Sequence, residues 1–159
     1  MERCEWKVDN YVAYENSLCA AHDFIRTVSD EITANSDTTG DLLSVSIRLQ
    51  SITELASTLP EGRAKIEACV NAAAIVDGDF DGSARQSVDD VQKAWQQLEE
   101  HLNDTKQSLN DAVKQWNAHK EHCDSLDECL RNMEKSVKKE VMISDVDEIR
   151  PLVKSYEVK

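Results

Sequence analysis

The sequence predicts an all-α fold, in which an antiparallel three-helix bundle passes its third helix into a second, truncated helical unit. Three observations predict this. Glycine and proline are rare, with 4 and 2 residues among 159, so the chain lacks the frequent turns of a β-sandwich or barrel. Hydrophobic residues make up 40% of the chain but aromatic residues only 5%, which is typical of an aliphatic helical core. Apolar residues recur at alternating spacings of three and four, the a/d pattern of coiled-coil helices.

Charge and hydropathy exclude several classes of function. The 31 acidic and 18 basic residues give a net charge of −13, which disfavours binding to nucleic-acid phosphates or to anionic lipid. No apolar run approaches the length of a membrane span, and no signal peptide is evident. The length corresponds to about one domain. The acidic surface favours a protein partner with a basic face.

The first predicted helix covers residues 3–33. Residues 33–40 follow it and are rich in turn and capping types, which predicts a loop. Side chains at a/d spacing form one face of this helix and are expected to be buried. They are Tyr11, Tyr14, Leu18, Ala21, Ile25, Val28 and Ile32.

The second predicted helix covers residues 39–76. Asp41 or Thr39 can cap its start through a side-chain oxygen. Pro60 lacks an amide donor and clashes with the preceding turn, so we expect a kink or short break at residues 59–62. The apolar stripe comprises Leu42, Val45, Leu49, Ile52, Ala56, Leu59, Ile66, Val70 and Ala73.

The third predicted helix begins near Ser83 and keeps its a/d pattern for about 50 residues without a glycine or proline. Such a helix extends about 75 Å at 1.5 Å per residue, longer than one globular core requires. It must pair along its length or pass from one core into the next, with the junction between Leu102 and Trp116. Its stripe comprises Val88, Val91, Trp95, Leu98, Leu102, Thr105, Leu109, Ala112, Trp116, His119, Cys123, Leu126, Leu130, Met133 and Val137.

An internal repeat favours passage into a second core. A shift of 105 residues places Tyr11 on Trp116 and keeps every later pair of the two stripes in phase. We therefore predict one complete unit at residues 1–108. Residues 109–159 are predicted to hold the first helix and the start of the second helix of a following unit, with a short loop at residues 142–145 between them.

These features resemble the spectrin repeat, a three-helix coiled-coil unit joined to its neighbour by a continuous helix. Val91, Trp95 and Leu98 are similar to the family's third-helix motif, and Trp116 to its first-helix tryptophan. Tyr11 stands where the first unit would carry a tryptophan. The sequence Leu-Pro-Glu-Gly at residues 59–62 is similar to repeats of the nesprins. Plakin and dystrophin repeats are related alternatives.

The resemblance implies a non-enzymatic scaffold segment of a giant cytoskeletal linker that transmits force between nucleus and cytoskeleton. It implies a cytoplasmic location at the cytosolic face of the outer nuclear membrane, without direct membrane contact by this segment. It also implies docking of a cytoskeletal regulatory protein, such as a formin-like actin-assembly factor, a motor or an adaptor. The residues themselves offer no catalytic motif and no cofactor site, which also predicts a non-enzyme.

Fourteen residues are predicted to form the structural core of the two units. Each is a large apolar or aromatic side chain on one of the three stripes, and the two tryptophans are expected to anchor their units. The fourteen are Tyr11, Leu18, Ile25, Leu49, Ile52, Ile66, Val91, Trp95, Leu98, Leu102, Leu109, Trp116, Leu126 and Leu130.

The loop at residues 77–82 provides an alternative function, a calcium-regulated helical binding module. Asp77, Asp79 and Asp81, followed by Gly82, match the opening half of an EF-hand loop. Position 12 of that loop would require a bidentate glutamate, and it is Val88 here. The loop is therefore a weak metal candidate, and an acidic helix connection is the simpler interpretation.

Histidine and cysteine residues provide a second weak metal candidate. His119, His122 and Cys123 have the i, i+3 and i+4 spacing that a metal can use, but no fourth ligand is evident. The five cysteines are odd in number and scattered, so no disulfide framework is expected. Most of them are predicted to be small buried hydrophobic residues.

Overall fold

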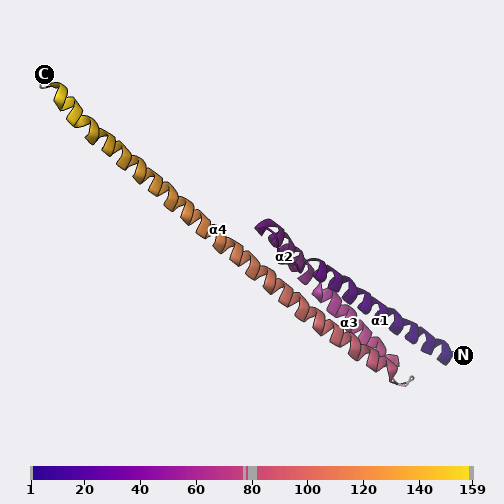
Figure 1. Ribbon diagram of the computed structural model, residues 1–159. Coiled ribbons are helices and arrows are strands. Elements are labelled where there is room, and N and C mark those ends of the chain that lie inside the picture. The colour runs from indigo at the N-terminus through magenta and orange to yellow at the C-terminus, as the bar shows by residue number, and fades with distance from the viewer. Residues whose placement is uncertain (1, 77, 79–81, 158–159) are drawn as a thin grey trace. The chain divides into compact units, whose positions relative to one another are not determined.

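The computed structural model describes residues 2–76, 78 and 82–157, with their side chains as far as Ile143. Four helices account for nearly all of them, and no strand occurs in the described ranges, which confirms the all-α class. The helices are α1 (Glu2–Ala34), α2 (Leu42–Ala56), α3 (Leu59–Val76) and α4 (Ser83–Glu157) (Figure 1). The chain divides into two units, Met1–Lys114 and Gln115–Lys159, and each is described by itself.

The first unit packs α1, the α2–α3 pair and the start of α4 side by side (Figure 1). The α1 and α4 helices run in the same direction, since the Tyr14 hydroxyl donates to the Ala84 carbonyl 3.5 Å away and Phe24 contacts Trp95 further along both. The α2–α3 pair runs in the opposite direction between them, as two consecutive helices separated by a short break. Arg63 of α3 forms an ion pair of 2.8 Å with Glu99 of α4.

The loop between α1 and α2 is held by its own polar groups. Asp41 caps α2 by accepting a hydrogen bond of 2.8 Å from the Ser44 amide, as the sequence predicts. Gly40 adopts a φ of 106°, a left-handed conformation that disfavours other residues. Arg48 Nη1 donates to the carbonyl oxygens of Asp37 (2.9 Å) and Thr39 (2.6 Å), which closes the loop onto α2.

The expected break in the second helix is confirmed, although it lies earlier than residues 59–62. The α2 helix ends at Ala56 and α3 begins at Leu59, which places Pro60 in the first turn of α3. A proline ring collides with the carbonyl four residues before it, and for Pro60 that residue is Ala56. The first turn of a helix tolerates proline because its amide has no partner there in any case.

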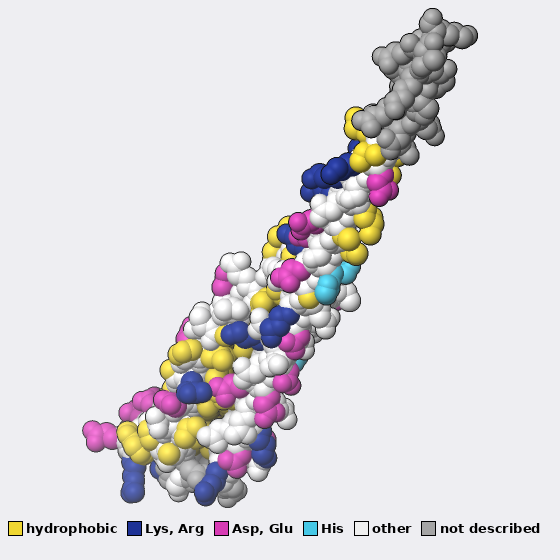
Figure 2. Space-filling model, turned by 90° about the vertical axis from the view of Figure 1, so that its left-hand side faces the viewer, with side chains coloured by type: hydrophobic (Ala, Val, Ile, Leu, Met, Phe, Trp, Pro, Cys, Tyr) yellow, Lys and Arg dark blue, Asp and Glu magenta, His cyan; other side chains and the backbone are white. Residues whose placement is uncertain are grey.

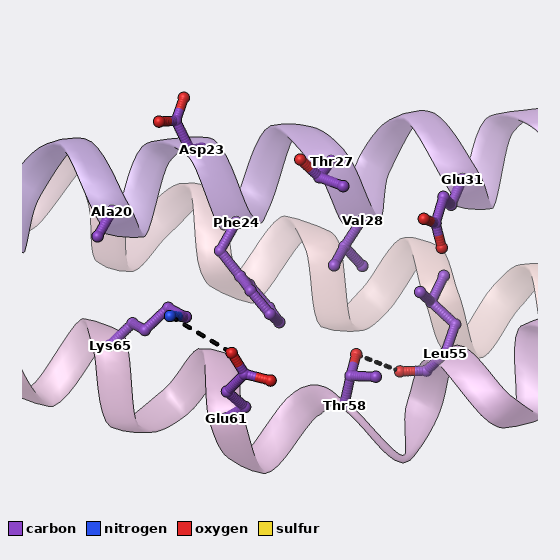
Figure 3. Close-up of a pocket in the computed structure, with 10 residues that line it drawn as sticks. All are labelled: Ala20, Asp23, Phe24, Thr27, Val28, Glu31, Leu55, Thr58, Glu61 and Lys65. Carbon is purple, nitrogen blue, oxygen red and sulfur yellow. Dashed lines mark hydrogen bonds and ion pairs between the residues drawn. The ribbon is translucent and has the colours of Figure 1, made fainter.

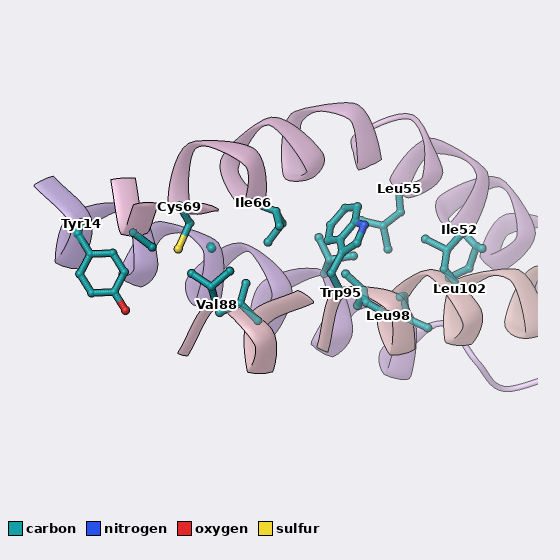
Figure 4. Packing of buried hydrophobic residues seen from close by; sticks show 14 of the residues in the cluster. Tyr14, Ile52, Leu55, Ile66, Cys69, Val88, Trp95, Leu98 and Leu102 are labelled. Atoms are coloured by element: carbon teal, nitrogen blue, oxygen red, sulfur yellow. The ribbon is translucent and has the colours of Figure 1, made fainter. Parts of the chain in front are cut away.

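The core of the first unit lies along the facing stripes of its helices (Figure 4). Seven of the fourteen predicted core residues are buried there: Ile52, Ile66, Val91, Trp95, Leu98, Leu102 and Leu109. Four more are partly buried and pack against the cluster: Tyr11, Leu18, Ile25 and Leu49.

Trp116, Leu126 and Leu130 differ from the prediction, because their side chains are exposed rather than buried. Within the described part of the second unit, residues 115–157, α4 is the one helix, so no second helix covers this face. Their role as the core of a following repeat stays a prediction.

Gly62 lies where two aromatic side chains come close to the backbone of α3. A Cβ atom at this position would lie 2.6 Å from Trp95 Cζ3 and would also overlap Phe24 Cε1. The Phe24 and Trp95 ring centroids are 6.3 Å apart, so both rings meet over the first turn of α3. The glycine of the Leu-Pro-Glu-Gly sequence therefore makes room for the tryptophan.

The loop predicted at residues 142–145 is absent. The α4 helix continues through these residues to Glu157. Met142, Ile143, Ser144 and Asp145 include no glycine or proline, the residues that most strongly end a helix, and the physical signal for a turn was therefore weak.

Candidate interaction surfaces

The apolar face of α4 in the second unit is exposed along the described residues. We call it the α4 seam, and it comprises Trp116, His119, Cys123, Leu126, Leu130, Met133 and Val137. The Leu126 side chain is 63% exposed and Leu130 57%. Trp116 stacks edge-on against His119 with ring centroids 5.9 Å apart. A long apolar stripe exposed to water is typical of an interaction surface.

Charge is divided unevenly along this part of α4. The four residues Glu121, Asp124, Asp127 and Glu128 make its first half acidic. Four cations then follow, and in Figure 2 dark blue side chains gather near the grey end of the helix. The cations are Arg131, Lys135, Lys138 and Lys139. A helix that covers the seam would therefore meet opposite charges at its two ends.

A groove in the first unit lies between α1 and the break that separates α2 from α3 (Figure 3). Its volume is about 470 Å³. Phe24 and Val28 of α1 point into it, and Leu55 closes one end. The remaining lining residues are Ala20, Asp23, Thr27, Glu31, Thr58, Glu61 and Lys65.

The rim of this groove is acidic. Glu61 is paired with Lys65 at 3.3 Å, and Asp23 with Arg26 at 3.0 Å. No ion pair or hydrogen bond is found for the Glu31 carboxylate among the described residues, and it turns toward the groove above Leu55 (Figure 3). The groove thus combines an apolar floor with a carboxylate that is available to a cation.

The predicted calcium loop lies mostly outside the described residues, because Asp77, Asp79 and Asp81 are not placed. Calcium binding by this loop stays a prediction. Elsewhere, the described part of the chain holds no group of three or more potential metal-ligating side chains. Cys123 Sγ lies 3.8 Å from His119 Nδ1, and both side chains are exposed.

The prediction that most cysteines are buried is wrong. Cys4, Cys19, Cys123 and Cys129 are exposed, and Cys69 alone among the five is buried. Cys4 and Cys19 lie on the outer face of α1, and the other two lie on the uncovered helix of the second unit. Burial raises the pKa of the Cys69 thiol, so this thiol stays protonated and acts as a small core residue.

None of the helices, over the residues that the structure describes, combines the length and apolar character needed to cross a membrane. Comparisons of the chain with protein-family models, curated protein sequences and solved structures returned no match.

Proposed function

We propose that the chain is a non-enzymatic scaffold segment of a longer cytoskeletal linker, built from spectrin-type helical units that carry tension and dock a regulatory protein. One observation carries the proposal. The a/d stripe of α4 is buried from Val88 to Leu109 and continues with the same spacing, but exposed, from Trp116 onward. A single helix thus belongs to one core and offers the matching face for a second.

The mechanical consequence follows from the helix backbone. Bending or unfolding α4 near Lys114 requires breaking its i to i−4 hydrogen bonds, so a load on one unit is transmitted to the next. Short loops and a continuous helix suit a spacer that resists extension. The N-terminal part of α4 is held in place by the core of the first unit.

The finer assignment is a nesprin-like linker on the cytosolic side of the outer nuclear membrane. Its support is the Leu-Pro-Glu-Gly sequence before the tryptophan helix, together with Gly62 seated against Trp95. The net charge of −13 supports a basic protein partner, such as an actin-assembly factor, a motor or an adaptor.

Interrupting α4 at the boundary between the units tests the coupling. Thr105 is buried in the first unit, so a proline there would damage the bundle itself. Lys114 and Gln115 are exposed, and the double change Lys114→Pro with Gln115→Gly interrupts the helix without removing a core side chain. The matched control, Lys114→Ala with Gln115→Ala, keeps the helix.

The exposed thiols of Cys19 and Cys129 provide one spin-label site in each unit, once Cys4 and Cys123 are changed to serine. We expect a narrow distribution of label distances for the parent and the alanine control, and a broad one for the proline–glycine variant. Equal widths in all three proteins would contradict mechanical coupling through α4.

A further inference from the structure

We infer that the groove between α1 and the α2–α3 break is the docking site for a basic amphipathic helix of a partner protein. The inference rests on the proposed function as a docking scaffold and gives that scaffold a specific site. The groove lies entirely within the first unit and does not involve the α4 seam.

The floor of the groove selects apolar side chains. Phe24 is half-buried and Val28 and Leu55 are buried, and these three side chains make up the apolar part of the floor (Figure 3). A volume of about 470 Å³ lies within the range of binding pockets and accepts a few aliphatic side chains. Thr27 and Thr58 are the uncharged polar side chains in its lining.

The length of the groove selects a helix. Its lining on α1 extends from Ala20 to Glu31, about 16 Å at the rise of an α-helix. This corresponds to three turns, over which a helix presents apolar anchors at i, i+3 or i+4, and i+7. The break at residues 57–58 opens the groove, since α2 ends there and α3 starts a new turn.

The charges around the groove select a basic partner. Three of its ten lining residues are carboxylates; Asp23 is paired with Arg26 and Glu61 with Lys65, which leaves Glu31 available to a partner. Glu31 projects toward the floor without a partner among the described residues, so it can receive a lysine or arginine next to the apolar anchors. An acidic helix would place like charges against Glu31, which disfavours it.

Synthetic helices provide the probe. One peptide of about four turns carries leucine at the anchor positions and lysine elsewhere; a second replaces lysine with glutamate, and a third replaces leucine with serine. We expect the leucine–lysine peptide to bind the full chain and the other two not to bind at about the same concentrations, as measured by calorimetry. Binding should slow hydrogen exchange in residues 20–31 and 55–65.

Neighbouring charges on α1 provide matched variants. Glu31→Lys reverses a groove carboxylate, whereas Asp30→Lys makes the same change at an exposed residue that does not line the groove. We expect Glu31→Lys to weaken the leucine–lysine peptide by about fivefold or more, and Asp30→Lys by less than about twofold.

Equal weakening by both variants, equal binding of the serine–lysine peptide, or no binding of the leucine–lysine peptide would each overturn the groove as a docking site. Circular dichroism of both variants checks that the fold is retained. The label-distance experiment at Lys114 and Gln115 does not depend on the groove, so failure of the docking site is distinguishable from failure of the scaffold proposal.

Discussion

Two stretches of α4 have the same pattern and opposite environments. From Val88 to Leu109 the a/d side chains face α1, α2 and α3, and Trp95 is 6% exposed. From Trp116 to Val137 the same spacing continues, but Trp116 is 38% exposed and the leucines after it more than half exposed. The helix itself is unbroken across both.

The comparison separates what a heptad pattern specifies from what it does not. The pattern specifies which face of a helix is apolar and therefore gains free energy when it is covered. It does not specify whether the covering helices are present. The first stretch is buried because α1 and the α2–α3 pair return alongside it, and the second stretch meets no such helix among the described residues.

Replacing each tryptophan by alanine should give the largest contrast between the two stretches. Trp95→Ala removes a ring that fills the core beside Phe24 and Gly62, and we expect it to lower the free energy of unfolding by about 3–5 kcal/mol. Trp116→Ala removes a partly exposed ring, and we expect a loss below about 1 kcal/mol. Urea unfolding followed by circular dichroism measures both, and similar losses would contradict the assignment of one core.

Replacing one leucine in each stretch by alanine should give a second contrast in stability, slightly smaller than that of the tryptophans. Leu109→Ala empties a fully buried position and should cost about 2–5 kcal/mol. Leu130→Ala changes an exposed side chain and should cost less than about 0.5 kcal/mol. If Leu130→Ala proves as costly as Leu109→Ala, the α4 seam is covered in solution, and sedimentation equilibrium would show whether a second copy covers it.

Two glycines of the first unit should differ in how well they tolerate an added methyl group. Gly62→Ala forces the Phe24 and Trp95 rings to move, and we expect a net loss of about 1–3 kcal/mol despite the better helix propensity of alanine. Gly78→Ala meets no atom within 4 Å and should leave stability nearly unchanged. Thermal unfolding compares them, and a stabilising Gly62→Ala would show that the rings are not tightly placed.

The smallest effect concerns the cap of α2. Hydrogen bonds from Ser44 hold the pKa of the Asp41 carboxyl below its ordinary value. A carboxyl with a lowered pKa in the folded state stabilises the fold above its unfolded pKa, and this contribution is lost as pH falls below about 4.

Asp41→Asn keeps an acceptor for the Ser44 amide but does not titrate. We therefore expect Asp41→Asn to reduce the loss of thermal stability between about pH 5 and pH 3, and Asp41→Ala to lower the melting temperature at neutral pH as well. An unchanged pH dependence in Asp41→Asn would indicate that other carboxylates, such as Asp37, account for it.

The periodicity of apolar residues was sufficient to predict the helices of the first unit and most of its buried residues. The capping role of Asp41 and the interruption caused by Pro60 were predictable because each depends on local backbone chemistry. The position of the break, at residues 57–58 rather than 59–62, was not predicted. Leu55 is buried although the predicted stripe did not include it, whereas Ala56 and Leu59 of that stripe are only partly buried.

The surfaces were less predictable than the core. Cysteine burial depends on the covering elements, so Cys69 fits the expectation and Cys123 and Cys129 do not. The groove also escaped sequence analysis, since its lining comes from α1 and from both sides of the α2–α3 break. The helix break and the acidic residues of α1 were both visible in the sequence. No periodic pattern indicates that they lie next to each other in the fold.

The Arg48 contacts with the carbonyls of Asp37 and Thr39 have a consequence for folding kinetics. The hydrogen bonds that hold this loop join residues at most eleven positions apart, so closing it requires little chain entropy. The α1–α2 hairpin can therefore form early, before the distant α4 docks onto it. Slowing of refolding by Arg48→Ala, without faster unfolding, would identify this hairpin as the folding nucleus.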